Sequence, residues 1–375
     1  MTVPSTDATQ WIFSPSVLLA TPSSSSSSFP LSKELYDRAR GVEFLYRLGS
    51  SLQLPTTALC TAATWFHRFY MRYSMEDYHR QDVAATCIFL ATKTEECGRK
   101  LRDIARVFQS KVNYNVPIEA ITKEAGSEVE QCQSNILATE EALLEALCFD
   151  FVVSSVHEVL VDLFEEHTED EVVQEVAWCI AHDSYRTVLC VLFGVRIIAA
   201  ACFILAQRMV AGPHSASLDA RICASAPSAS LLTPPSNKPR SPDATRFAIE
   251  HLQFSEDELR DLSEALTILL EFYVAQEVQL NVLPNFLAPL TTVQPPASSP
   301  NRTKLYVPYI QAATASNGAV RTDQKPDLND RTPDSSHGGN SPAKVSSSSG
   351  WVPVTGEVKE SDGSKGTRGG RLDLS

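Results

Sequence analysis

Histidine and cysteine side chains act as bases, nucleophiles or metal ligands in many proteins, but here their spacing fits none of these roles. His67, His79, His157 and His182 are scattered, and the chain has no glycine loop of the kind that holds phosphates. The nine cysteines form neither a Cys-x-x-Cys pair nor a Cys/His cluster at zinc spacing. We therefore predict no catalytic residue, no metal and no cofactor. The cysteines, most of them inside apolar runs, are expected to be reduced core residues of an intracellular protein.

An internal repeat points to the elements that must organise the chain. Residues 83–93 recur at residues 198–208, a shift of 115 positions, with five of eleven residues identical. The same shift aligns Ala62, His67 and Tyr70 with alanine, histidine and tyrosine in the second copy. Two separate segments that agree on one shift predict a duplicated helical module.

The charge balance favours protein partners over nucleic acid. The chain of 375 residues has a net charge of −13, and residues 1–300 hold 22 Lys and Arg against 37 Asp and Glu. Nucleic-acid binding depends on basic residues that neutralise phosphates, so no direct DNA binding is expected. The apolar run Val188–Met209 is interrupted by Gly194 and Arg196. A central arginine costs about 2.5–3.5 kcal/mol in a membrane span, so we predict a buried helix and no membrane association.

The predicted fold is all-α, with two five-helix modules. After a flexible segment, residues 1–30, the first module occupies residues 31–152, and Asp82 is expected to cap its central, all-apolar helix. Apolar spacing places its helices near residues 32–52, 55–69, 82–91, 101–108 and 134–148.

The second module is predicted at residues 153–282. It contains a central helix near residues 196–209 and a last helix that begins at the capping box Ser255…Glu258. The Ala-, Ser- and Pro-rich residues 211–245 are predicted to be a disordered insertion, and residues 283–375 a disordered tail.

Three ordered motifs resemble the cyclin box. They are Trp65-Phe-His-Arg-Phe-Tyr-Met-Arg72, Ala84-Ala-Thr-Cys-Ile-Phe-Leu-Ala-Thr-Lys-Thr-Glu-Glu96 and Glu140-Glu-Ala-Leu-Leu-Glu-Ala-Leu-Cys-Phe-Asp-Phe151. The first is similar to transcriptional cyclins of the K, T, C and L types. The lead-in Trp11-Ile-Phe with Thr21-Pro22-Ser23 resembles that of cyclins K and T.

The resemblance implies tandem cyclin folds and a kinase-binding face. Lys93 and Glu140 match the family's Lys/Glu pair, which bonds main-chain groups beside the regulatory helix of the kinase. The positions that match the family's apolar anchors for that helix are Leu90, Leu144, Phe149 and Phe151. Each also has a simpler interpretation: Lys93 as a helix C-cap, Glu140 as a solvated carboxylate, and the leucines as core residues.

Three further positions match structural residues of the cyclin box, namely Arg38, His67 and Ala91. The usual aspartate partner of the arginine is replaced by His67, as in other transcriptional cyclins. This change leaves the presence of a buried arginine–carboxylate pair open.

The implied function is that of a non-catalytic regulatory subunit. Such a cyclin forms a heterodimer with a cyclin-dependent protein kinase in the nucleus and activates it toward the C-terminal domain of RNA polymerase II during elongation. The alternative is a cyclin-fold general transcription factor that binds DNA and polymerase directly. Those proteins usually carry a Cys₂–Cys₂ zinc ribbon before the repeat, whereas this chain has no cysteine before Cys60.

Overall fold

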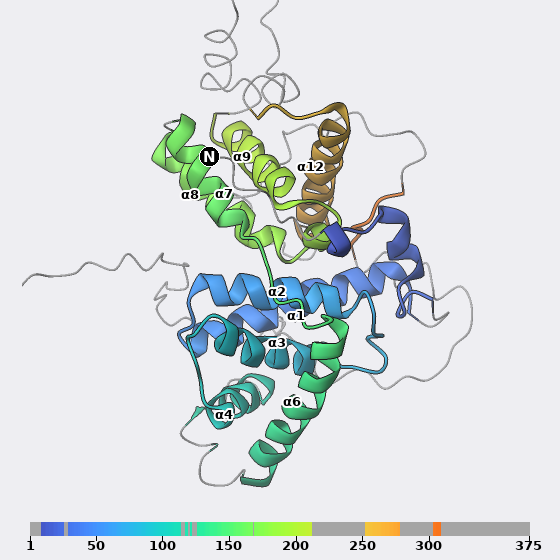
Figure 1. Cartoon of the computed structure of the whole chain (residues 1–375), viewed down its shortest axis with the longest axis vertical. Coiled ribbons are helices and arrows are strands. Elements are labelled where there is room, and N and C mark those ends of the chain that lie inside the picture. The colour runs from blue at the N-terminus through green and yellow to red at the C-terminus, as the bar shows by residue number, and fades with distance from the viewer. Residues whose placement is uncertain are drawn as a thin grey trace, which may run out of the picture. The chain divides into compact units, whose positions relative to one another are not determined.

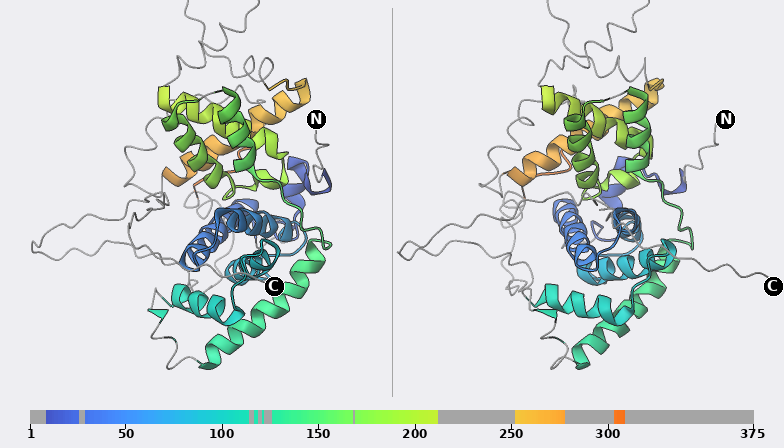
Figure 2. Two further views of the ribbon diagram at one scale, coloured as in Figure 1. Left: turned by 60° about the vertical axis from the view of Figure 1, so that its left-hand side comes forward. Right: turned by 90° about the vertical axis from the view of Figure 1, so that its left-hand side faces the viewer.

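The computed structural model describes residues 9–25, 29–113, 117–118, 121, 126–167, 169–211, 252–277 and 303–308. All of these belong to one compact unit, residues 1–324. No β-strand occurs among the described residues, and their helices form two bundles, which both views of Figure 2 show as separate groups. The fold is therefore all-α, as predicted.

The first bundle surrounds one buried helix. Its helices are α1 (Leu31–Ser51), α2 (Thr56–Phe69), α3 (Arg80–Thr94), α4 (Leu101–Val112) and α6 (Gly126–Ala146). Helix α3 contacts the other four, and Figure 1 shows it between the α1–α2 pair and the α4–α6 pair. Its centre is apolar on every side, so only a central position buries all of it.

Two helix starts differ from the prediction. Helix α3 is capped by His79, whose side chain accepts from the backbone N–H of Gln81, so Asp82 lies inside the first turn. Helix α6 begins at Gly126, about two turns before the predicted start at Ser134. Its early turns are largely polar and hold Val129 and Cys132 as buried apolar residues, and α6 packs against α4 and α3.

Two glycines allow α1 and α2 to pack closely. A Cβ atom on Gly41 would lie 2.2 Å from Cζ of Phe66, and one on Gly49 would lie 2.1 Å from Cδ2 of Leu59. Both distances are far inside van der Waals contact. Any larger residue at these positions would force the two helices apart.

The second bundle has the same central feature. Among the described residues it contains α7 (Val156–His167), α8 (Glu171–Ser184), the 3₁₀ helix η3 (Val188–Val191), α9 (Val195–Ala211) and α12 (Glu256–Glu277). Helix α9 contacts α7, α8 and α12. The repeat partners Ala84 of α3 and Ala199 of α9 are both fully buried, as the predicted duplication requires.

The last helix begins at the predicted capping box. The hydroxyl of Ser255 accepts from the backbone N–H of Glu258, and the Glu258 carboxylate accepts from the backbone N–H of Ser255 at 2.8 Å. The predicted insertion, apart from residue 211, and most of the predicted tail lie outside the described residues.

Parts of both predicted flexible ends are packed on the bundles. Near the N-terminus are the 3₁₀ helices η1 (Thr9–Trp11) and η2 (Pro15–Ala20), which bury Trp11 and Leu18. Within the predicted tail, residues 303–308 bury Tyr306, whose hydroxyl accepts from the backbone N–H of Val188 at 3.1 Å. Single large apolar residues in Ser- and Pro-rich surroundings anchor these segments.

The described cysteines are all free thiols, but not all are core residues. Burial raises the pKa of Cys60 to about 12 and also raises that of Cys87. Cys148 and Cys179 are exposed, which corrects the expectation for these two positions, and Cys223 lies outside the described residues. Within the described part of the chain, no helix is long and apolar enough to cross a membrane, and no cluster of side chains could hold a metal ion.

Candidate partner-binding site

Lys93 and Glu140 meet at the surface of the first bundle. Lys93 lies in the last turn of α3, and its Nζ donates to Oε1 of Glu140, on α6, at 2.5 Å. The Lys93 ammonium also lies 4.1 Å from the ring centroid of Phe89. The lysine side chain remains 47% exposed, whereas that of Glu140 is 12% exposed. The ammonium group is thus held by a carboxylate and a ring, yet it stays open to a partner.

The apolar residues predicted for this face differ in exposure. Phe149 is 66% exposed, and Leu144, one turn after Glu140 on α6, is half-buried. Phe151 is also half-buried, with its ring 5.9 Å from that of Trp65 in an edge-on arrangement. Leu90 is only 5% exposed and belongs to the core cluster, so it presents almost no surface to a partner.

The exposure of Phe149 depends on an unusual end to α6. Cys148 and Phe149 have φ angles of 51° and 56°, in the left-handed region that bulky residues rarely adopt. Two hydrogen bonds hold this turn, from the Cys148 N–H to the Glu145 carbonyl and from the Phe149 N–H to the Leu144 carbonyl. Backbone strain of this kind concentrates at functional sites. Since no glycine marks the turn, the sequence did not reveal it.

Arg38 is fully buried and has a carboxylate partner. Its Nε and Nη2 atoms donate to Oε1 of Glu34 at 2.9 and 2.7 Å, and its Nη1 donates to the backbone carbonyl of His67 at 2.9 Å. The other Glu34 oxygen accepts from the hydroxyl of Thr21. The question left open by the sequence is answered: the carboxylate comes from one turn earlier on α1. The i, i+4 spacing of Glu34 and Arg38 in the sequence could have predicted this ion pair.

His67 joins the two bundles. It is fully buried, and its Nε2 lies 2.9 Å from the backbone carbonyl of Tyr185, at the end of α8. Burial and the nearby Arg38 guanidinium lower the pKa of His67 to about 3. The ring is therefore neutral at physiological pH and donates from Nε2 to that carbonyl. Ala91, the third structural position, is fully buried on α3.

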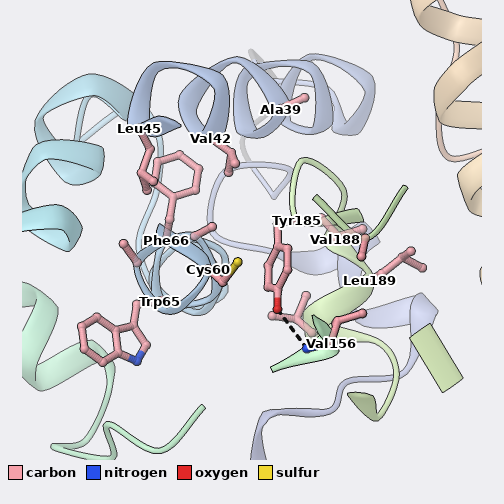
Figure 3. Packing of buried hydrophobic residues seen from close by; sticks show 14 of the residues in the cluster. Ala39, Val42, Leu45, Cys60, Trp65, Phe66, Val156, Tyr185, Val188 and Leu189 are labelled. Atoms are coloured by element: carbon pink, nitrogen blue, oxygen red, sulfur yellow. Dashed lines mark hydrogen bonds between the residues drawn. The ribbon is translucent and has the colours of Figure 1, made fainter. Parts of the chain in front are cut away.

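Tyr185 and its neighbours fill the space between the bundles. Figure 3 shows its hydroxyl reaching Val156, with Cys60 on one side and Val188 and Leu189 on the other. That hydroxyl accepts from the backbone N–H of Val156 at 3.2 Å. The contact fixes the start of α7 and so the end of the segment that connects the bundles.

Comparisons with known proteins show what the chain is similar to. The family model for the cyclin N-terminal domain matches residues 20–152. Cyclin pch1 of Schizosaccharomyces pombe (strain 972 / ATCC 24843) is 44% identical over 204 residues, which cover 53% of this chain and 58% of that protein. Cyclin-T1-4 of Arabidopsis thaliana is 31% identical over 205 residues, covering 54% of this chain and 38% of that protein. The chain thus spans less than two thirds of either relative.

The fold has a counterpart among solved structures. A chain in the structure of the CAK complex from Chaetomium thermophilum bound to ATP-γ-S matches with a TM-score of 0.50 and 18% identity. The match covers 86% of this chain and 97% of that one. Residues 20–152 thus match the cyclin N-terminal domain, and the chain is similar to cyclins of Schizosaccharomyces pombe and Arabidopsis thaliana over about half of its length.

Proposed function

We propose that this chain is a regulatory subunit that binds a cyclin-dependent kinase and activates it. The kinase would act in transcription by RNA polymerase II, in the nucleus, by phosphorylating the polymerase C-terminal domain during elongation. The relation to cyclin T supports this assignment. The observation that carries it is the Lys93–Glu140 pair with its exposed ammonium group, together with the exposed Phe149 on the turn after α6.

The pair is suited to exchange its internal bond for bonds to a partner. The Lys93 side chain is 47% exposed, so water can replace the Glu140 carboxylate around its ammonium group when the internal bond opens. Lys93 can then donate to main-chain carbonyls at the end of a partner helix, while Glu140 accepts from main-chain N–H groups. Hydrogen bonds that involve a charged group are the stronger kind, and they fix the register of the helix.

The aromatic residues supply the apolar part of the contact. Phe149 projects from the strained turn after α6, and Phe151 and Leu144 lie partly open near it in sequence. Burial of a phenylalanine ring against a partner contributes about 1.5–3 kcal/mol. Contact at this face would press the kinase regulatory helix inward, so that its glutamate pairs with the ATP-contacting lysine. The chain itself supplies no catalytic group in this proposal.

A double substitution tests the site. The variant with Lys93→Ala and Glu140→Ala should bind the co-purifying kinase about 1,000-fold more weakly, because two binding hot spots of about 2 kcal/mol each sum to about 4 kcal/mol. Its helical content by circular dichroism should not change, because the double substitution removes both charges together and leaves no buried charge without its partner. A matched control is Arg40→Ala with Glu43→Ala, which removes another partly exposed pair on α1, of 2.6 Å.

Three results would contradict the proposal. Loss of folding in the Lys93 and Glu140 variant would make the pair structural, and unchanged affinity would place the interface elsewhere. Retention on DNA at physiological salt without any associated kinase would favour the general transcription factor instead. Activity toward a polymerase C-terminal repeat peptide, present in the complex and absent from the chain alone, tests the substrate.

A further inference from the structure

A cavity of about 570 Å³ lies where the two bundles meet. Its walls come from the lead-in at Trp11, from Arg68 of α2, from the connecting residues 152–154, and from the starts of α9 and α12. Cavities of this volume at the junction of two folding units are typical ligand sites. The kinase-binding proposal assigns no kinase contact to these wall residues, so the inference below does not rest on it.

Arg68 is a buried cation without a bound carboxylate. The residue is only 5% exposed, and its Nη1 donates to the backbone carbonyl of Val152 at 3.1 Å. Its guanidinium stacks on Trp11 at 4.8 Å, while its Nε is buried and has no hydrogen-bond partner among the described residues. The nearby Asp150 carboxylate instead accepts from the indole N–H of Trp11, at 2.8 Å, and from the Gln10 side chain.

A buried cation without a close counter-ion is costly for the fold. Desolvation lowers the pKa of the Arg68 guanidinium, with only partial compensation from Cys190 and Asp150. Native proteins pair almost all of their buried charges. An anion that enters the cavity would supply the missing negative charge.

The start of α9 provides further donors on the same cavity. The first backbone N–H groups of a helix have no partner within it, and they carry partial positive charge. Gly194 precedes α9 and has no side chain that could accept from these groups, and both Gly194 and Val195 line the cavity. A helix of 17 residues therefore directs its positive end toward the cavity that Arg68 also lines.

The cavity also contains two carboxylates, Glu258 and Asp261 of α12. Arg196 offsets the first, with Nη1 3.9 Å from Oε1 of Glu258, and it also donates to the backbone carbonyl of Leu252 at 3.2 Å. The α12 wall is therefore acidic but partly neutralised, whereas Arg68 on α2 lines the cavity without a bound carboxylate. An anion would bind at the Arg68 wall, away from α12.

We propose that this cavity is a phosphate-binding site, which takes the group either as the free anion or on a serine or threonine side chain of a partner protein. A carboxylate could satisfy the guanidinium, but a phosphate has three acceptor oxygens and nearly two negative charges, enough for Arg68 and the helix start together. Two apolar residues on the cavity, Val152 and Ile12, are 58% and 39% exposed and can contact residues that flank a phosphorylated side chain.

The test measures binding to the full chain at constant ionic strength. Calorimetric titrations use inorganic phosphate, a phosphoserine peptide with valine or leucine on both sides, and its unphosphorylated form. Saturable binding of the phosphorylated probe, with none of the unphosphorylated peptide, is expected. At about 100-fold over its dissociation constant, a bound probe should raise the melting temperature by about 5 °C. Tighter binding of the peptide than of inorganic phosphate would identify a phosphorylated side chain of a partner protein as the ligand. Tighter binding of inorganic phosphate would identify the free anion as the ligand.

Two variants locate the site. Arg68→Met removes the cation, and Val195→Asp places a carboxylate at the first position of α9, where it favours the helix but repels an anion. Each should reduce phosphate affinity at least 10-fold, and Val195→Asp decides the matter if Arg68→Met does not fold. Arg260→Met, which removes an exposed arginine on α12, should leave the affinity unchanged. Absence of saturable binding to the wild-type chain, or full retention of binding in Val195→Asp, would overturn the proposal.

Discussion

Replacement of Glu34 by glutamine should destabilise the protein by about 3 kcal/mol. The Glu34 and Arg38 side chains are both 0% exposed, and two hydrogen bonds join the guanidinium to one carboxylate oxygen. Removal of one partner from a buried ion pair typically costs about 3–5 kcal/mol, because the other charge remains buried. Glutamine keeps the shape and one acceptor oxygen, so the lower end of that range applies. The Arg38 bond to the His67 carbonyl should persist.

Urea unfolding followed by circular dichroism measures this change. The matched control is Glu43→Gln, which breaks a partly exposed pair with Arg40 on the same helix and should cost no more than about 1 kcal/mol. A double variant, Glu34→Leu with Arg38→Met, should be more stable than Glu34→Gln alone because it leaves no buried charge. If Glu34→Gln costs as little as the control, Arg38 does not depend on this carboxylate and the reasoning fails.

Three further predictions follow from buried groups. The lowered pKa of His67, about 3, means that its contribution to stability is complete above pH 6.5 and is lost as the pH falls toward 3, by about 1.4 kcal/mol per pH unit. His67→Gln should flatten the dependence of the free energy of unfolding on pH between pH 6.5 and 4. An unchanged slope in this variant would contradict the prediction. Gly41→Ala should cost about 1–3 kcal/mol in urea unfolding through a clash with a buried ring, whereas Gly98→Ala, with nothing within 4 Å, should be nearly neutral. Tyr306→Phe should cost about 1–3 kcal/mol and speed hydrogen exchange at the Val188 amide, and an unaffected amide would mean that the segment is not docked there.

The sequence predicted most of the helices because apolar residues recur at regular spacing on the buried face of a helix. Helices α3 and α9 are apolar nearly all round, and their repeat was visible because both must fill the centre of a bundle. The start of α6 was missed because its early turns hold only two buried apolar residues, Val129 and Cys132, among polar ones. Burial of Trp11 and Tyr306 was missed because one large residue in a polar segment gives no periodic signal.

The candidate site was less accessible to sequence reasoning. Lys93 and Glu140 are 47 positions apart, so no local spacing could bring them together, and only a resemblance suggested their pairing. The exposure of Phe149 follows from a positive φ angle at a residue that normally avoids it. Leu90 was predicted to contact the partner but is buried in the core. The sequence could not separate these two cases, because an apolar residue on a helix can face either a partner or the core.

The second bundle helps to order the proposed partner site, although none of the residues assigned to that site belongs to it. The residues that connect the bundles carry Phe149 and Phe151, and three contacts hold this connection at successive points. The indole of Trp11 donates to Asp150, Arg68 donates to the carbonyl of Val152, and the second bundle, through the Tyr185 hydroxyl, accepts from the N–H of Val156. A flexible connection would have to be ordered on binding, at about 1–2 kcal/mol per residue. Because the second bundle and the lead-in already order it, the two aromatic rings can meet a partner without that cost.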